Sequence, residues 1–238
     1  MSGHSKWKTI KHKKALTDAK KSKGFTKVIK EITIAARQGG GDITGNPRLR
    51  TLVEKAREIN MPLDNVTRAI KKGTGELPGV QYEAGAYEGY GPGGIAILIE
   101  TLTDNKNKAI AEIRHVFSRH ACNLAETGAV NWMFERLGVV RTKSMNLSED
   151  DLMEKLLDFD IKDISKDEDG IEITCNPKAL EQVKKAMIDL GAQVEEAEVE
   201  MVAKTPVEVT PAVEEKALEF LDAIEDLEDV QNVYTNLG

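Results

Sequence analysis

Apolar side chains recur at helical spacing through the first third of the chain, and they form three stripes. The first ends at the glycine run 39–41 and comprises Phe25, Val28, Ile29, Ile32 and Ala36. The second comprises Leu49, Leu52, Val53, Ala56 and Ile59. The third comprises Val66, Ala69 and Ile70. It begins after Pro62, a residue that suits the first position of a helix, and it ends at Gly73. The pattern predicts a small bundle of three helices. Residues 1–22 show no such stripe, and we expect them to form an arm or a loosely held helix.

The pattern changes after residues 73–79, whose sequence GTGELPG is typical of a linker. Two short apolar runs flank a turn that is rich in glycine, and a helical stripe and another apolar run follow. We therefore expect strands at 86–90 and 95–101, a helix at 106–120 and a strand around 128–132.

Residues 133–204 predict a complete βαββαβ unit, which is the ferredoxin-like order. Ser148 with Asp151 three positions later has the spacing of a helix-capping box. A second helix is expected to start at Asn176 and Pro177 and to stop at Gly191. The expected strands are 134–142, 161–165, 171–175 and 193–202.

The tail predicts a strand at 207–209, a helix that opens at Thr210 and Pro211, and a strand at 230–234. This βαβ half has no partner nearby in sequence, and neither has the half at 95–132. We expect the two halves to pair in space, so that 133–204 is an insertion between them. The predicted class is α+β. Its domains are a basic helical domain at 1–78, a discontinuous α/β domain at 79–132 with 205–238, and an inserted ferredoxin-like α/β domain at 133–204.

Charge divides the chain at the same point. Residues 1–78 hold 18 Lys and Arg against 7 Asp and Glu, a net charge of +11, whereas residues 79–238 hold 15 against 33, a net charge of −18. The overall charge of −7 therefore conceals two opposite halves. Such asymmetry indicates that one half meets a polyanion.

Other motifs predict little chemistry. Gly89, Gly91 and Gly94 match GxGxxG, but the apolar run 95–99 that follows favours a hairpin turn over a dinucleotide site. The two cysteines, Cys122 and Cys175, have no CxxC spacing and are expected to be buried, reduced thiols. The four histidines lack metal-binding companions, and the acids at 158, 160 and 163 fail the EF-hand pattern. We expect no cofactor, no metal and no enzymatic activity.

The lysine-rich opening is the strongest candidate site. Lysine ammonium groups find phosphate oxygens without fixed geometry, and an aromatic ring among them can stack on an unpaired base or pack on the bundle. A solvated charge run that only aids solubility is the competing interpretation, but the basic excess continues along the predicted helices. The candidate nucleic-acid-binding residues are Lys6, Trp7, Lys8, Lys11, His12, Lys13, Lys14, Lys20, Lys21, Lys23, Arg48 and Arg50.

Four separated blocks of sequence resemble the YebC/PmpR family: the opening MSGHSKWKTIKHKKALTDAKKSKGFTKVIKEI, then GGGDITGNPRLR, YEGYGPGGIAILIETLTDNKNK and GAVNWMF. The resemblance covers essentially the whole chain. It implies a helical bundle and two α/β domains, the third inserted in the second. Members of that family are described as DNA-binding transcriptional regulators, while others, including the mitochondrial translational activator of cytochrome c oxidase, act in translation. Bacterial relatives are linked to ribosomes stalled on proline-rich sequence.

Two functions therefore remain open. The chain is expected to be a cytoplasmic DNA-binding regulator of transcription, or a ribosome-associated translation factor that binds rRNA or tRNA. Charge alone does not separate them, because both backbones present the same phosphates. The acidic α/β domains are expected to contact a protein partner or a second copy of the chain. The longest apolar run, 95–99, is too short to span a bilayer, so no membrane partner is expected.

Overall fold

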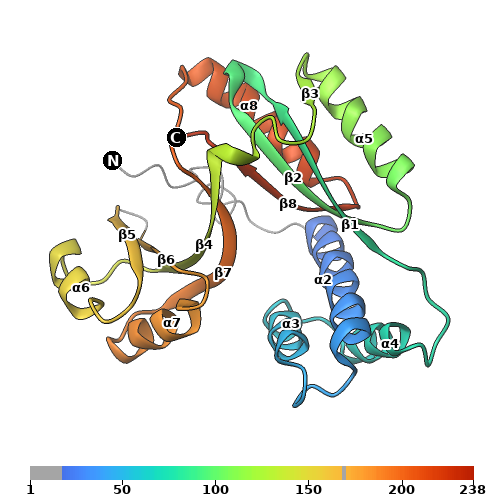
Figure 1. The fold of residues 1–238 in the computed structure, drawn as a ribbon, viewed down its shortest axis with the longest axis horizontal. Helices are drawn as coiled ribbons and strands as arrows, with labels where there is room; N and C mark the ends of the chain where they lie inside the picture. The colour runs from blue at the N-terminus through green and yellow to red at the C-terminus, as the bar shows by residue number, and fades with distance from the viewer. Residues whose placement is uncertain (1–17, 168–169) are drawn as a thin grey trace.

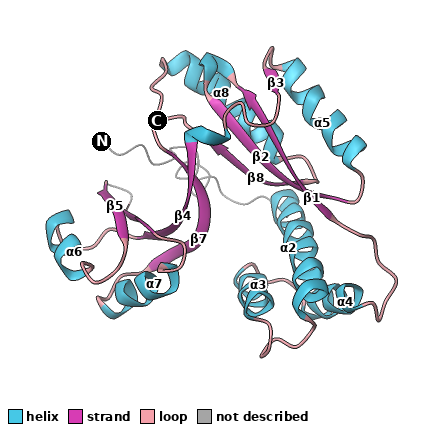
Figure 2. Ribbon diagram, in the orientation of Figure 1, coloured by secondary structure: helices cyan, strands magenta, loops and turns pink. Residues whose placement is uncertain are grey.

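The computed structural model describes residues 18–167 and 170–238, apart from the side chains of residues 18–23. It is a mixed α+β structure with a helical bundle and two four-stranded antiparallel sheets (Figures 1 and 2). Of residues 1–22, which are expected to form an arm or a loosely held helix, the first 17 lie outside the described residues, and residues 18–22 belong to the first helix of the bundle.

The bundle consists of α2 (Asp18–Gly39), α3 (Pro47–Glu58) and α4 (Leu63–Thr74). The three stripes predicted from the sequence supply its core, in which Ile32, Leu49 and Ala56 are completely buried. Two predicted boundaries were wrong. Pro62 caps α4 instead of opening it, and Gly73 lies inside α4.

Helix α4 ends at Gly75, whose φ of +84° is the left-handed conformation that glycine adopts most readily. Gly73 serves packing instead. A Cβ added there would lie 2.4 Å from the Thr33 carbonyl oxygen of α2. The two helices can therefore approach closely only because this position has no side chain.

The first sheet has the strand order β3-β1-β2-β8. Its strands are β1 (Glu83–Tyr90), β2 (Ala96–Thr103), β3 (Asn123–Ala125) and β8 (Val230–Thr235). The helices α5 (Lys106–Arg119) and α8 (Pro211–Glu225) cover one face, where their apolar side chains pack on those of β2 and β8. The tail thus completes a sheet that begins more than a hundred residues earlier, because β8 pairs with β2. This is the pairing that we expected between the half in the tail and the half at 95–132.

The hairpin interpretation of the glycine motif is confirmed, since β1 and β2 pair antiparallel around the short 3-10 helix η1 (Pro92–Gly94). Two expected strands were wrong. Residues 128–132 form a turn that leads into a second 3-10 helix, η2 (Asn131–Met133). In the tail, Val207 makes only an isolated bridge to Leu237.

The second sheet is formed by residues that lie between β2 and β8 in the chain. Its order is β5-β6-β4-β7, from β4 (Phe134–Thr142), β5 (Ile161–Lys166), β6 (Ile171–Cys175) and β7 (Val194–Ala203). Helices α6 (Glu149–Lys155) and α7 (Leu180–Asp189) pack on one face. The capping box of Ser148 and Asp151 is confirmed, whereas α7 begins at Leu180 and not at Asn176.

A small apolar cluster joins the two sheets. Ala96, Leu98 and Tyr234 lie on the face of the first sheet opposite its helices, and they contact the start of β4 and the end of β7 through Phe134 and Met201. Burial raises the pKa of the Tyr234 hydroxyl, and the Glu100 carboxylate that accepts its hydrogen bond raises it further. The second sheet is therefore packed against the first, and not merely tethered to it.

Candidate nucleic-acid interface

The structure describes only part of the predicted basic site. Lys6, Trp7, Lys8, Lys11, His12, Lys13 and Lys14 lie outside the described residues. Lys20, Lys21 and Lys23 are on the first turns of α2, where the backbone alone is described. Arg48 and Arg50 are described completely, and both are exposed at the start of α3. The expectation that the twelve residues form one surface therefore stays a prediction.

The loop between α2 and α3 is held by one buried amide. The Asn46 side chain donates to the carbonyl oxygens of Ala35 and Gly40, both at 2.9 Å, and accepts from the Leu49 amide at 3.1 Å. This last bond caps α3 at its N-terminus, where asparagine is a favoured cap. A side chain at Gly39 would overlap Asn46, because a Cβ there would lie 2.6 Å from its amide nitrogen. Arg48 and Arg50 therefore lie on a helix start whose backbone is held in place by Asn46.

Arg48 is oriented by the last turn of α2, and Arg50 is oriented by this loop. Arg48 donates to the Gln38 side-chain oxygen at 2.9 Å, and Arg50 donates to the carbonyl oxygens of Ile43 and Thr44 at 3.3 and 2.7 Å. A guanidinium has five N–H groups, so these contacts leave donors for a phosphate. Hydrogen bonds from the side chain and the amide of Thr44 lower the pKa of the nearby Asp42 carboxyl, which is ionised at neutral pH.

Not every basic residue of the first 78 is available to a ligand. Lys30 is 3% exposed, and its ammonium binds Asp229 at 2.6 Å and the carbonyl oxygens of Leu102 and Glu228 at 3.2 and 3.0 Å. It also lies 5.7 Å from the ring centre of Tyr82. This buried lysine fixes helix α2 to the first sheet.

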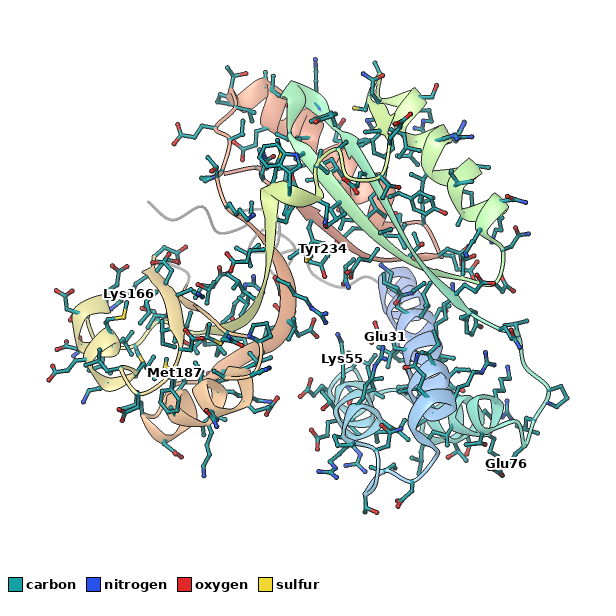
Figure 3. The ribbon with its side chains drawn as sticks, viewed as in Figure 1. Glu31, Lys55, Glu76, Lys166, Met187 and Tyr234 are labelled. Atoms are coloured by element: carbon teal, nitrogen blue, oxygen red, sulfur yellow. The ribbon has the colours of Figure 1, made fainter. Side chains whose placement is uncertain are left out.

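Lys55 joins the bundle to the second sheet through an ion pair with Glu198 of β7. Burial would lower the pKa of Lys55, but the Glu198 and Glu31 carboxylates more than offset it and raise the pKa. Burial raises the pKa of the neighbouring Glu31 carboxyl. Figure 3 shows Glu31 and Lys55 on the side of the bundle that faces β7. The sequence offered no signal for Lys30 or Lys55, because each partner lies far along the chain.

The face of the second sheet opposite α6 and α7 is rich in carboxylates. Arg141 of β4 is flanked by its cross-strand neighbours Glu172 and Glu196, which its guanidinium contacts at 2.7 and 2.8 Å. The same guanidinium contacts Glu200 at 2.8 Å. Burial would lower the pKa of Arg141, but these carboxylates more than offset it and raise the pKa.

Three carboxylates of β7 also have the geometry of a metal-binding group. Within the described ranges, Glu196, Glu198 and Glu200 bring one oxygen each to within 4.8 Å of one another. Arg141 and Lys55 already contact all three side chains. The cluster is accordingly explained by ion pairs with these two cations.

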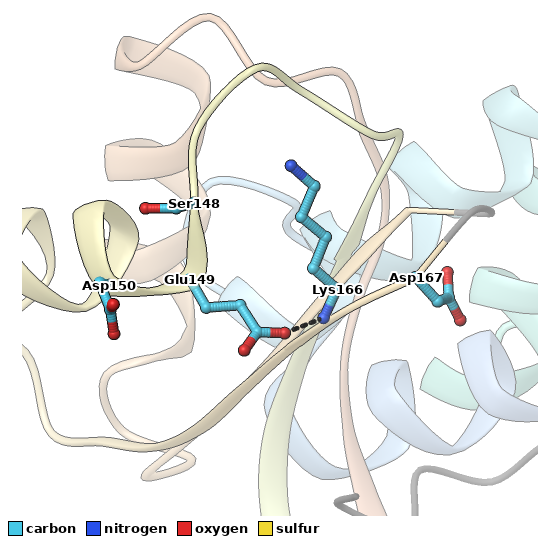
Figure 4. A pocket seen from close by; sticks show the side chains of 5 residues that line it. All are labelled: Ser148, Glu149, Asp150, Lys166 and Asp167. Atoms are coloured by element: carbon cyan, nitrogen blue, oxygen red, sulfur yellow. Dashed lines mark hydrogen bonds between the residues drawn. The ribbon is translucent and has the colours of Figure 1, made fainter.

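A shallow pocket on the second sheet's unit does not provide an alternative site. It is lined by Ser148, Glu149, Asp150, Lys166 and Asp167 (Figure 4). The Lys166 amide donates to Glu149 at 2.8 Å, and its ammonium donates to the carbonyl oxygens of Met145 and Leu147. These groups are engaged in holding the loop, so the pocket offers no obvious catalytic arrangement.

Two other expectations can be compared with the structure. Cys122 and Cys175 are both free thiols, as predicted, but only Cys175 is buried as expected, whereas Cys122 is half-buried. Burial raises the pKa of each thiol. Among the helices in the described parts of the chain, none has the length and apolarity needed to cross a membrane.

The architecture defines a class of α+β proteins in which a basic helical end is attached to two sheets of acidic character. The TACO1/YebC N-terminal domain model matches residues 5–76, and the model of the TACO1/YebC second and third domain matches residues 82–237. The chain belongs to the TACO1/YebC family. The first match includes the lysine-rich opening from residue 5 onward.

Relatives in bacteria match over nearly their whole length. A probable transcriptional regulatory protein of Desulfosudis oleivorans is 51% identical over 99% of this chain and 96% of its own. One from Chlorobaculum tepidum is 53% identical over 100% of this chain and 95% of its own. The crystal structure of a conserved hypothetical protein from Aquifex aeolicus is 40% identical, with a TM-score of 0.81, and the match covers 93% of this chain and 91% of that one.

Proposed function

We propose that this protein is a cytoplasmic nucleic-acid-binding regulator, and that it binds DNA to regulate transcription. The observation that carries the proposal is the separation of charge, +11 in residues 1–78 against −18 in the remainder. The names of the bacterial relatives, probable transcriptional regulatory proteins, support the regulatory role. They also support a function without catalysis.

The proposed contact surface is the basic N-terminal region, with Arg48 and Arg50 at one end of its bundle. Lysine-dominated contacts reach the phosphate backbone and carry little sequence information. We propose that the bundle and the two sheet-containing units are three domains, with the second sheet's unit inserted in the first. The family descriptions name an N-terminal domain and a second and third domain, which supports a count of three.

The acidic sheets orient the molecule in this proposal. A net charge of −18 repels a nucleic acid that approaches from that side. The bundle then faces the nucleic acid, and the acidic units face outward, toward a protein partner or a second copy of the chain.

A ribosome-associated translation factor is the second candidate. It is favoured by the description of the family, which names TACO1 together with YebC. The family that the sequence resembles includes the mitochondrial translational activator of cytochrome c oxidase. The same lysines would then contact rRNA or tRNA. Enrichment of promoters or of rRNA and tRNA after crosslinking in cells separates the two candidates. Cosedimentation with ribosomes that is lost at high salt is a simpler test.

The contact surface is tested by salt dependence. For duplex DNA, the logarithm of the binding constant falls with the logarithm of salt concentration at a slope of about −0.9 per phosphate neutralised. Replacing Lys11, Lys13 and Lys14 with alanine should therefore flatten the slope by up to about 2.7, measured by fluorescence anisotropy of a labelled duplex.

The matched control removes three lysines from the unit of the second sheet. Lys178, Lys184 and Lys185 lie on or just before α7, on the unit of the second sheet. Their replacement with alanine changes the net charge by the same amount and should leave the slope unchanged. An equal effect of both triple variants, or an unchanged slope in the first, contradicts the proposed surface.

A further inference from the structure

Trp132 is the most conspicuous exposed aromatic side chain in the described residues. It lies in η2 and is 64% exposed, although tryptophan is usually buried for most of its surface. The segment that carries it, residues 128–133, joins β3 to β4 and runs between the two sheets (Figure 1). A single exposed apolar residue is common on protein surfaces. Trp132 differs because specific contacts hold both its turn and its side chain.

A buried carboxylate fixes the turn before Trp132. Glu88 of β1 is 4% exposed, and it accepts from the amides of Gly128 and Val130 at 2.7 Å and of Asn131 at 2.9 Å. Burial would raise the pKa of Glu88, but the three amide donors more than offset it and lower the pKa. Val130 is completely buried in the cluster between the sheets. The turn is thus anchored by a charged group and by an apolar side chain.

The indole itself is also oriented. Its N–H donates to the Ala129 carbonyl oxygen at 3.0 Å, and the Tyr90 hydroxyl approaches the same oxygen at 3.4 Å. Tyr90 is 37% exposed. Because the only polar atom of the indole is engaged within the turn, the ring offers a partner its flat face and not a hydrogen bond.

The surroundings of Trp132 differ in charge from the rest of the acidic region. The Lys204 ammonium donates to the Trp132 carbonyl oxygen at 2.8 Å, and Lys204 is exposed. The other exposed charges close to the turn in sequence are Glu126, Glu135 and Arg136. Together with Lys204 they sum to zero, in a part of the chain whose net charge is −18. A phosphate beside the indole would therefore lie close to the Lys204 ammonium.

We propose that Trp132 is a stacking platform for one unpaired nucleobase, with Lys204 contacting the adjoining phosphate. This inference rests on the proposed nucleic-acid function and adds a second contact, on the junction of the two sheets. Stacking suits the geometry, because every base has a π-face and the ring needs no hydrogen-bond match. A protein surface that buries the indole is the competing occupant. The nucleobase is favoured by the exposed cation beside a ring whose N–H is already used.

The test uses the two tryptophans of the chain. Replacing Trp7 with phenylalanine leaves Trp132 as the single tryptophan. The variant is titrated with a labelled single-stranded oligonucleotide and separately with the matching duplex. Label anisotropy reports binding, and indole emission, corrected for absorbance by the oligonucleotide, reports stacking. We expect emission to be quenched by the single strand in step with anisotropy, and to be unchanged by the duplex.

Affinity provides the second readout. Stacking contributes about 1–3 kcal/mol per base, which corresponds to about a 5- to 150-fold change in affinity. Trp132→Ala in the otherwise native chain should weaken single-strand binding within that range and leave duplex binding unchanged, while Trp132→Phe should retain part of the affinity. Leu157→Ala is the matched control, because Leu157 is 71% exposed on the unit of the second sheet and lies away from the turn.

The outcomes distinguish this inference from the proposed function. Anisotropy that rises while Trp132 emission and the Trp132→Ala affinity stay unchanged overturns the platform and leaves the proposed function standing. Equal quenching by the duplex overturns the requirement for an unpaired base. Emission that responds only to self-association, with Trp132→Ala reducing the sedimentation coefficient at high protein concentration, assigns the indole to a protein contact and overturns the platform. No anisotropy change when the native chain, with Trp7 in place, is mixed with either nucleic acid overturns both proposals.

Discussion

Replacing Lys30 with methionine removes the ammonium that fixes helix α2 to the first sheet. Methionine keeps the length and the apolar stem of the side chain, so the change isolates the charge and its hydrogen bonds. The lysine and Asp229 side chains are only 4% and 6% exposed, and two carbonyl oxygens share the same ammonium. The variant therefore leaves a buried carboxylate without its principal cation.

The magnitude follows from what remains around Asp229. Breaking a buried ion pair by removing one partner typically costs about 3–5 kcal/mol. Asp229 keeps a hydrogen bond from the Thr103 hydroxyl at 2.9 Å, and the Lys108 ammonium lies at 3.9 Å. These groups soften the loss, and we expect the lower end of the range, about 3 kcal/mol, or about two decades in the unfolding equilibrium.

The assay is urea unfolding followed by circular dichroism. Lys108→Met is the matched control, because Lys108 lies near the same carboxylate but its own side chain is 47% exposed. We expect this variant to lose about 0–1 kcal/mol of the free energy of unfolding. Adding Asp229→Asn to the Lys30 variant should recover part of the loss, because it removes the buried charge. A Lys30→Met variant whose stability matches that of Lys108→Met would refute the reasoning.

Three further predictions concern stability. Gly73→Ala should cost about 1–3 kcal/mol by thermal unfolding, because its Cβ would meet the Thr33 carbonyl oxygen, whereas Gly24→Ala in the open part of α2 should not destabilise. Glu88→Gln should cost about 1.5–3 kcal/mol at neutral pH. The folded state lowers the pKa of Glu88, so its carboxylate contributes to the free energy of unfolding above the usual carboxyl pKa of about 4.3. That contribution is lost as the pH falls through the pKa of the folded state. A loss of stability in Glu88→Gln that does not change with pH would contradict this. Arg141→Lys should cost about 1–3 kcal/mol at neutral pH, because one ammonium cannot reproduce a guanidinium shared by three carboxylates, and an unchanged melting temperature would contradict it.

Features set by neighbours in sequence were predictable. The capping box of Ser148 and Asp151 needs only residues three positions apart, and the hairpin of Gly89 and Gly91 follows from the apolar run after it. The strand 171–175 was bounded correctly because its apolar alternation ends at a turn on both sides. Local chemistry decides each of these cases.

Features set by distant residues were not predictable. The sequence of residues 128–132 suggests a strand, but three amides of this segment donate to the Glu88 carboxylate. A strand would have used these amides in hydrogen bonds to a neighbouring strand. Lys30 and Lys55 belong to the basic excess by sequence, yet their partners lie 199 and 143 positions away. Composition therefore overstated the charge available to a ligand. Arg48 and Arg50 are exposed, and the binding of nucleic acid by them and by the other basic residues stays a prediction.

The pairing of β2 with β8 has a consequence for synthesis of the protein. Ile97 pairs with Thr235, so the first sheet cannot close until nearly the whole chain has left the ribosome. The second sheet, built from 134–203, can form earlier, while β2 still has an open edge. A chain that ends before Val230 would keep that apolar edge exposed indefinitely, which is a template for aggregation. Premature termination before Val230 would therefore favour aggregation over a shortened functional protein.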